Sequence, residues 1–434
     1  MKKSLLAALC LTVAAFAGTS LPQPAAAADP LAFPGAQGWA AETKGGRGGR
    51  IIKVTTLAAT GPGSFAEAVA TKGPRIVVFE VGGVIDLERT ALKITEPFLT
   101  IAGQTAPSPG ITFIRGGLDI VTHDVIVQHI RVRPGEAEQP KMGGMDFDAI
   151  ATLGGAYNVI VDHCSLTWAT DENLSASGPR VQGDTPEEWR RNTSHRITFS
   201  NNIIAEGLAY SSHAKGEHSK GSLIHDNVSD ILIIGNLYSN NMERTPLFKG
   251  GVRGAIVNNL IYNPGQKAIH YNLIAQEWGD HPFQLGQMSV VGNVMRAGPD
   301  TWDGLPLVMV GGSGDVELHM ADNLTMDRLG RPLPEFGLYT TAPIKVSRLD
   351  SPPVWPEGLK ALPAEAVQDA VIKNAGARPW ERDPVDARIV ADVIEGRGAI
   401  IDSEKEVGGY PVVKETRAPF DPAAWNLDDM TPRK

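Results

Sequence analysis

Short apolar runs rich in β-branched residues recur through the middle of the chain and predict short buried strands. They are VIVQHIRV (125–132), VIVDHCSL (159–166), ITFSNNII (197–204), ILIIGNLY (231–238), AIVNNLIY (255–262) and SVVGNVMR (289–296).

A polar residue interrupts each run at one equivalent point, where we expect the chain to turn. Aligning the runs places these residues in one column: His129, His163, Asn202, Asn236, Asn259 and Asn293. By subtraction, the intervals between them are 34, 39, 34, 23 and 34 residues. The shortest interval fits one bare coil of a solenoid, and the longer ones fit the same coil carrying a loop. Polar residues repeated at one turn can stack into an amide ladder that satisfies buried backbone groups.

An antiparallel sandwich is the main alternative for a chain of short strands. It requires hairpin turns such as Asn-Gly at intervals of about 8–12 residues, and no such turn lies between these runs. The pattern therefore predicts an all-β fold, a right-handed single-stranded parallel β-helix over residues 29–330.

Both ends of the predicted solenoid carry helical patterns. In GPGSFAEAVA (61–70), Ser64 can cap a short helix that covers the open N-terminal end. Residues 331–434 are Pro-rich at first, and we expect this C-terminal extension to pack along the β-helix. Two helices are predicted within it, over 364–374 and 384–395, and the second presents one apolar face. That face consists of Ala387, Ile389, Val390 and Val393.

The N-terminal residues have the layout of a cleavable secretory signal. Lys2 and Lys3 precede the apolar run 5–17, and small residues follow at 25–28. The run is shorter than the roughly 20 residues of a membrane anchor. We therefore expect a signal peptide over 1–28, cleavage near Ala28, and a secreted protein that is extracellular or periplasmic.

Removal of the signal changes both the thiol content and the charge of the chain. Cys10 would leave with it, so Cys164 would remain alone and no internal disulfide could form.

The formal net charge would change from −9 to −11 as Lys2 and Lys3 are lost. Nucleic acid is disfavoured as a partner because phosphate binding requires a basic surface. A polyanionic substrate would need a local basic cleft or a bridging cation. We expect a monomer that binds no membrane.

Acidic residues gather in two loop segments, DFDAI (146–150) and TWATDENLS (167–175). Asp146 and Asp148 point to the same side if their backbone is extended. A hard cation such as Ca²⁺ could bridge them with Asp171 or Glu172. The alternative is that these acids are solvated loop charges or turn caps.

Basic residues gather in two later segments, EHSKGSLI (217–224) and MERTPLFKGG (242–251). Lys220, Arg244 and Lys249 could form a basic wall one or two coils from the acidic segments. A lone Arg in a turn is usually solvated or ion-paired. On a solenoid, however, successive coils rise by only about 4.8 Å, so residues distant in sequence can line one groove.

The order of these segments resembles that of polysaccharide lyase family 1, the pectate and pectin lyases. The resemblance covers roughly residues 33–300. It rests on five motifs in the order of the family: GPGSF, the DxD at 146–148 followed by a strand, VDH at 161–163, HSKGSLI at 218–224 and RTPLFKGG at 244–251.

This resemblance implies a role for each candidate residue. Asp146 and Asp148 are similar to the calcium-site carboxylates of the family, and Lys220 to the lysine that binds the substrate carboxylate. Arg244 is similar to the catalytic arginine. Lys249 resembles a second basic substrate ligand, and the HSKGSLI motif makes His218 a substrate-binding candidate.

The sequence departs from the family pattern at two places. The family typically supplies two further acids about four residues apart on the following coil, whereas Asp171 and Glu172 are adjacent here. The alternatives for the calcium ligand therefore stay open. Lys249 stands where many members have arginine. Lysine keeps the positive charge but lacks the bidentate fork of a guanidinium.

The resemblance implies a calcium-dependent lyase that cleaves an acidic polysaccharide, polygalacturonate or pectin, by β-elimination. A polygalacturonase-type hydrolase is one rival, but the Asn-Thr-Asp and His-Gly motifs of that family are not visible. A non-catalytic carbohydrate-binding β-helix is another. It predicts an aromatic platform on one face, whereas four of the tryptophans are scattered along the sequence: Trp168, Trp189, Trp278 and Trp302. The acidic segments disfavour a calcium-free pectin lyase.

Overall fold

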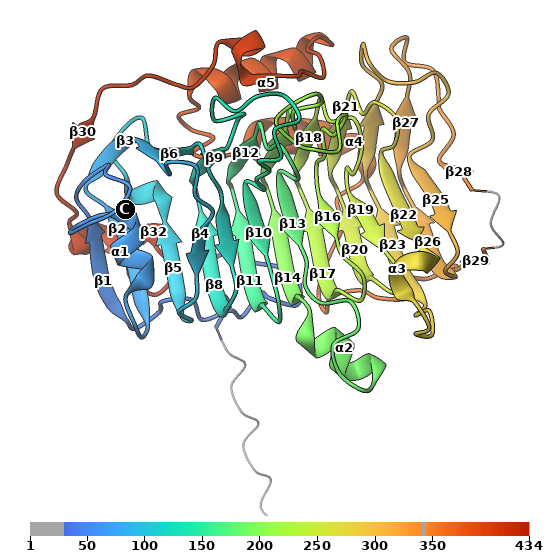
Figure 1. Cartoon of the computed structure of the whole chain (residues 1–434), viewed down its shortest axis with the longest axis horizontal. Coiled ribbons are helices and arrows are strands. Elements are labelled where there is room, and N and C mark those ends of the chain that lie inside the picture. Colours follow the sequence, from blue (N-terminus) through green and yellow to red (C-terminus); the bar gives the residue numbers. More distant parts are fainter. Residues whose placement is uncertain (1–29, 341–343, 434) are drawn as a thin grey trace, which may run out of the picture. The chain divides into compact units, whose positions relative to one another are not determined.

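Three parallel sheets run the length of the molecule in a computed structural model that describes residues 30–340 and 344–433 (Figure 1). The described residues from 31 onward form one compact unit. The sheets contain 11, 9 and 10 strands, and their strand orders interleave along the chain. Each coil thus contributes one strand to each sheet, which confirms the predicted parallel β-helix.

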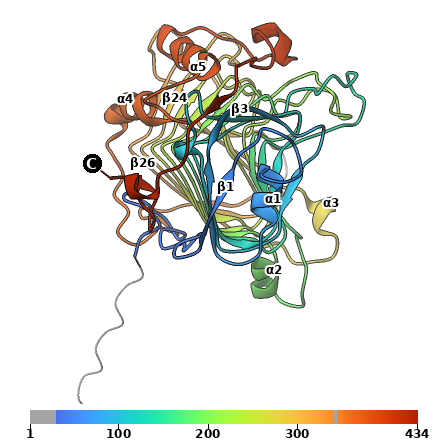
Figure 2. The same ribbon diagram turned by 90° about the vertical axis from the view of Figure 1, so that its left-hand side faces the viewer.

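One coil shows how the chain passes between the sheets. It runs through β8 (His123–Gln128), β9 (Arg131–Arg133) and β10 (Ile150–Thr152) before β11 (Tyr157–Asp162) begins the next coil directly on β8. Only two residues separate β8 from β9, whereas a longer loop separates β9 from β10. Figure 2 shows the coils end-on, with the strands stacked behind one another.

The predicted turn column is correct for its asparagines but wrong by one residue for its histidines. His129 and His163 occupy the first position of the two-residue turn, with φ of 57° and 49°. The asparagines occupy the second position, because β11 pairs with β14 (His195–Ser200) at an offset of 38 residues, Val159 opposite Ile197. The predicted interval of 39 therefore contained a slip of one residue.

The asparagine ladder itself is confirmed and is one residue longer than predicted. The Nδ2 of Asn236 donates to Oδ1 of Asn259 at 2.9 Å, and that of Asn259 donates to Oδ1 of Asn293 at 3.0 Å. Asn323 extends the ladder, since its Oδ1 accepts from the backbone N–H of Asn293 at 2.9 Å. Each amide also binds a backbone carbonyl of an earlier strand, as Asn236 binds Phe199 at 3.0 Å. The ladder therefore satisfies buried backbone groups along the turn.

Helix α1 (Phe65–Ala70) covers the N-terminal end of the solenoid, as predicted. The side chain of Ser64 accepts a hydrogen bond from the backbone N–H of Glu67 at 3.2 Å and caps the helix. Phe65 is buried against Phe113, with ring centroids 4.6 Å apart. An apolar plug thus closes the core that an open coil would expose.

Helices α4 (Ala364–Asn374) and α5 (Pro384–Glu395) occupy the predicted residues and lie along one side of the strand stack (Figure 1). Their apolar residues form one buried cluster with Ile203, Leu237 and Leu260 of the solenoid. The predicted apolar face of α5 was wrong at Ala387, which is exposed. Asp386 is buried instead.

Buried ion pairs explain why an acidic residue faces inward on α5. Arg133 donates to Asp383 at 2.6 Å and to Asp386 at 2.8 Å. Arg131 donates to Asp386 at 3.1 Å, and Ser165 does so at 2.7 Å. Removing one member of such a buried set leaves its partners as uncompensated charges. These contacts therefore hold α5 against the strands.

The strand repeat continues beyond residue 330, where the sequence pattern becomes Pro-rich. Strands β28 (Phe336–Leu338) and β29 (Val346–Arg348) still pair in parallel with the preceding coil. Farther along, β30 (Thr416–Arg417) pairs with β3 (Val81–Asp86) at the other end of the molecule, as an antiparallel strand added to the otherwise parallel 10-stranded sheet.

The predicted signal peptide lies outside the described residues. Within the described part of the chain, no helix is long and apolar enough to cross a membrane. Cys164 is a free thiol inside the core, where burial raises its pKa.

The ladder yields a first prediction. Replacing Asn236 or Asn259 by Leu should destabilise the fold by about 1–3 kcal/mol for each buried group left unpaired. Thermal melting measures the loss, and Asn374→Leu, at an exposed position of α4, is the matched control. Melting temperatures unchanged from the wild type would contradict a stabilising ladder.

Candidate functional site

The candidate residues lie on loops that leave the same side of successive coils. The loops follow β9, β12 (Ser165–Thr167), β15 (Ile203–Ala205) and β18 (Leu237–Ser239). Single parallel bridges link Glu172 to Lys220 and Lys220 to Glu243 across the last three loops. Strand stacking therefore brings acidic and basic residues from distant segments into one charged cluster.

Three carboxylates converge in this cluster, from Asp148, Asp171 and Glu172. One oxygen of each lies within 4.8 Å of the others. The Oδ1 of Asp148 accepts the backbone N–H of Glu172 at 2.9 Å, and its Oδ2 accepts the hydroxyl of Ser175. Burial, and then the charge of Asp171, raise the pKa of Asp148 well above its ordinary value. A cation would relieve this repulsion.

Asp146 does not join the three carboxylates, although the sequence grouped it with Asp148. Its side chain is 55% exposed, and its Oδ2 lies 3.6 Å from Nε2 of His213. Asp148, two residues later, turns inward to Ser175. The structure therefore separates two acids that an extended backbone would have placed side by side.

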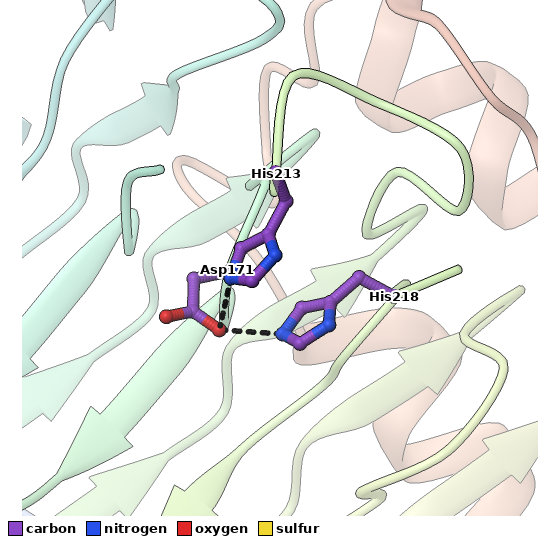
Figure 3. Close-up of side chains that lie close together, drawn as sticks. All are labelled: Asp171, His213 and His218. Atoms are coloured by element: carbon purple, nitrogen blue, oxygen red, sulfur yellow. Dashed lines mark hydrogen bonds and ion pairs between the residues drawn. The ribbon is translucent and has the colours of Figure 1, made fainter. Parts of the chain in front are cut away.

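Two stacked histidines flank Asp171 (Figure 3). The rings of His213 and His218 lie 3.9 Å apart and within 10° of parallel. The Nε2 of His218 is 2.6 Å from Oδ1 of Asp171, and that of His213 is 3.8 Å from the same oxygen. Burial acts to raise the pKa of Asp171, but the hydrogen bond and charge of His218 lower it overall. His218 thus holds Asp171 as an anion.

Basic residues of the next coils each contact a carboxylate. Lys220 Nζ lies 2.6 Å from Oε1 of Glu243, and Lys267 binds the other oxygen of the same carboxylate. Burial acts to raise the pKa of Glu243, but the charges of His270, Lys220 and Lys267 lower it to about 2. Glu243 is therefore an anion that holds two lysines at the site.

Arg244 lies between the acidic and basic groups. Its Nη1 contacts Oε1 of Glu172, and its Nε is 3.9 Å from Oε1 of Glu243. Burial lowers the pKa of Arg244, and the charges of Asp171, Asp148 and Glu277 oppose that shift. The backbone of Arg244 is left-handed, with a φ of 63°. The guanidinium therefore faces carboxylates from a partly desolvated position.

Lys249 ends β19 (Leu247–Lys249) and contacts two carboxylates at the next position along the site. Its Nζ binds Oε2 of Glu277 and lies 3.6 Å from Oδ2 of Asp226. Arg180 donates to the same two carboxylates, at 2.9 Å to Asp226 and 2.7 Å to Glu277.

A cleft of about 300 Å³ opens beside these groups. Its lining includes Arg244 and Lys249, which the sequence predicted, and further charged residues that it did not. The additional ones are Arg180, Lys215, Glu243, Lys267 and Glu277. Lys220 is not a lining residue, but it contacts Glu243, which is one.

Two of the missed residues left a signal in the sequence. Glu243 is adjacent to Arg244, and Ser175 stands four residues after Asp171, at the spacing where the resemblance led us to expect a second acid. His213, Lys267 and Glu277 stand in no motif. Only the stacking of coils brings them to the site.

Curated relatives align with almost the whole chain, although no family model matches it. "Probable pectate lyase C" of Aspergillus flavus is 32% identical over 396 residues, which is 90% of this chain and 84% of that protein. The protein of the same name from Neosartorya fischeri is 34% identical over 390 residues, covering 87% and 81%. The chain belongs to the pectate lyase family.

Solved structures agree with this lyase in fold. The major allergen of cedar pollen matches with a TM-score of 0.55 at 16% identity, covering 79% of this chain and 92% of that one. A mutant of Bacillus subtilis pectate lyase matches with a TM-score of 0.52 at 14% identity, covering 79% and 96%. Membership of the pectate lyase family confirms the resemblance and disfavours both the hydrolase and the binding module.

The buried carboxylates of the lyase yield a second prediction. Asp148→Asn should stabilise the protein in a chelator at neutral pH, because the amide removes a charge that burial and Asp171 disfavour. The pKa of Asp148 in the folded protein lies above its ordinary value of 3.8. This carboxyl group therefore lowers the stability of the fold as pH rises from 3.8 to the folded-state pKa. The gain in melting temperature should therefore shrink as pH falls toward 3.8. A variant that melts below the wild type at pH 7 would contradict this account.

Proposed function

We propose that this lyase cleaves polygalacturonate by calcium-dependent β-elimination, with Arg244 and Lys220 at the reacting sugar. The observation that carries the proposal is the contact of Arg244 with Glu172. This contact joins the three converging carboxylates to the basic residues Lys220, Arg244 and Lys249. A substrate of net negative charge can enter an acidic protein only where such basic residues face it.

The three carboxylates fit a calcium ion by donor type and spacing. Calcium binds oxygen ligands at about 2.3–2.6 Å, so ligands on opposite sides of one ion stand roughly 5 Å apart. Oxygens of Asp148, Asp171 and Glu172 within 4.8 Å of one another satisfy that limit. We assign the ion to these residues and leave Asp146 outside its ligands. A bound calcium ion supplies positive charge beside the uronate carboxylate.

The reaction removes the C5 proton of a uronate and breaks the C4–O bond. As the proton leaves, charge grows on the neighbouring carboxylate, and the ammonium group of Lys220 can neutralise it. Arg244 takes the C5 proton, the electron pair forms the C4–C5 double bond, and the departing C4 oxygen is protonated from solvent. His218 keeps Asp171 in place, and Lys249 binds a carboxylate of the polysaccharide substrate.

The environment of Arg244 supports its role as the base. A guanidinium is normally protonated because its pKa exceeds 12. Burial lowers the pKa of Arg244, whereas Asp171 and Asp148 oppose the shift. These two residues are also proposed metal ligands. Once a cation neutralises their charge, burial acts with less opposition and favours the neutral guanidine.

We further propose that the protein is secreted, with residues 1–28 removed as a signal peptide. N-terminal sequencing of the protein recovered from the medium or periplasm tests this, and retention of residues 1–28 would refute it.

Removal of calcium yields a third prediction. Excess chelator should abolish the appearance of unsaturated product, followed by ultraviolet absorbance, while the far-ultraviolet circular dichroism stays unchanged. Asp148→Ala should raise the calcium concentration that gives half-maximal rate by roughly tenfold or more, since one charged ligand is lost. Full activity in chelator, or an Asp148→Ala variant with the calcium dependence of the wild type, would refute the assignment.

Arg244→Lys yields a fourth prediction. Lysine keeps one positive charge but loses the planar guanidinium and its fixed donors. If Arg244 takes the C5 proton, kcat on polygalacturonate should fall by roughly 100-fold or more with little change in KM, since a transition-state interaction is lost. A variant that retains about a tenth or more of the wild-type kcat would exclude Arg244 as the base.

A further inference from the structure

A second pocket, of about 530 Å³, lies at the short turns between the first and second strands of the coils. The loops that carry the charged cluster follow the second strand instead, so the pocket and the cleft occupy different corners of the coil. Three distant segments line the pocket: the solenoid turns, residues 33–35 and the C-terminal extension. Its volume falls within the roughly 300–1,000 Å³ of ligand-binding clefts.

The VDH motif at 161–163 supplies two lining residues, Asp162 and His163, and the proposed reaction uses neither. Asp162 is buried. Its two oxygens accept four hydrogen bonds at 2.8–3.1 Å, from the side chains of Gln128, His163, Ser200 and Asn201. Burial acts to raise the pKa of Asp162, but the charge and hydrogen bond of His163 lower it overall. Asp162 is therefore an anion that orients His163 rather than a ligand-binding group.

Two stacked histidines line the pocket with opposite hydrogen-bonding roles. The ring centroids of His129 and His163 lie 5.0 Å apart. Because a carboxylate only accepts, Nδ1 of His163 donates to Oδ2 of Asp162 at 2.8 Å. Nδ1 of His129 accepts the backbone N–H of Arg378 at 3.3 Å, and burial lowers the pKa of His129 to about 3, so this neutral ring carries its proton on Nε2. With His163 also neutral, the pocket presents a donor, Nε2 of His129, beside an acceptor, Nε2 of His163.

Aromatic rings of the C-terminal extension form another part of the lining. Trp380 is 62% exposed, and its ring centroid lies 4.9 Å from that of His129. Trp425 lies on β31 (Trp425–Asn426), which pairs with β32 (Thr431–Pro432). The two indole rings supply apolar surface on which a flat ligand can pack.

The charges around the pocket disfavour an ionic ligand. Among the described residues that line it, none is Lys or Arg, whereas Asp162 and Asp429 are acidic. A uronate carboxylate would lose water there without gaining a cation. A cationic ligand is disfavoured as well, since the guanidinium of Arg378 already lies 5.4 Å from the ring centroid of Trp380.

We infer that this pocket binds a neutral pyranose sugar, with the sugar ring against Trp380 and neighbouring hydroxyls on His129 and His163. Each hydroxyl can both donate and accept, so two of them satisfy one donor and one acceptor. The inference goes beyond the proposed function and uses none of the residues that carry it. A sugar bound here attaches the protein to a neutral glycan at a corner of the coil that the reaction does not use.

Saturation-transfer NMR at pH 8, where an ordinary imidazole is neutral, tests binding of glucose, galactose, mannose and xylose. We expect the wild type to bind at least one of these sugars, and Trp380→Ala to weaken that binding roughly tenfold, since a packing surface is lost. Trp302→Ala is the matched control, because Trp302 is 58% exposed and lies outside the pocket lining. It should leave the affinity unchanged.

Galacturonate, measured in excess chelator, is the matched acidic ligand, and Trp380→Ala should not change how it binds. The methyl glycoside of the sugar that binds distinguishes two sources of the ligand. Binding of the glycoside supports the end of a glycan chain, and binding of the free sugar alone supports a soluble monosaccharide in the same pocket.

Failure of all four neutral sugars to bind would overturn the inference, as would undiminished binding by Trp380→Ala or equal losses in both tryptophan variants. A galacturonate affinity that Trp380→Ala lowers by the same factor would overturn it too, since the pocket would then accept an acid. Melting temperatures show whether Trp380→Ala folds. If it does not, Asn374→Trp provides the same test, because it places a bulky ring at an exposed lining position and blocks the pocket.

Discussion

Parallel pairing between successive coils is the interaction on which the rest of this structure depends. It sets a rise of about 4.8 Å per coil, so every coil repeats the previous one with little freedom to shift. A one-residue slip in a strand would turn its apolar side chains away from the core. The asparagine ladder strengthens the same register, since each amide bonds both to the next asparagine and to a backbone carbonyl. Loops can then vary in length without changing where they begin.

The site follows from that constraint. Loops that leave one side of consecutive coils must stack, and their charges come within contact distance whatever their separation in sequence. The acids Asp148 and Glu172 are followed on the next two loops by Lys220 and Glu243. The ion pairs between Lys220 and Glu243 and between Arg244 and Glu172 form where these loops meet. A fold that brought only acids or only bases together here would pay a large electrostatic cost. The mixture leaves a cleft in which five basic side chains stand among four acidic ones, in a protein that is acidic as a whole.

The sequence predicted the fold and much of the site because both depend on local patterns. β-Branched runs, turn asparagines and the Ser64 cap each act within a few residues, and each was found where the pattern indicated. Predictions failed where a distant contact overrode the local pattern. Ala387 fits the apolar stripe of α5, yet Asp386 is buried instead, because Arg131 and Arg133 of the solenoid provide its partners. Asp146 and Asp148 separate because Ser175 and the backbone of Glu172 bind only the second.

The amino-acid sequence by itself determined the coil repeat, the residue types at the turns and the presence of Asp148, Asp171, Lys220, Arg244 and Lys249. These features are encoded by periodicity and by motifs of adjacent residues. The tertiary structure alone decided which charges meet. Glu277 is 97 residues from Arg180 in the chain, and the two bind because their loops project into one cleft. Pairing between charges that far apart in the chain depends on how the coils stack and on how long the loops are. Neither can be read from a short segment of residues.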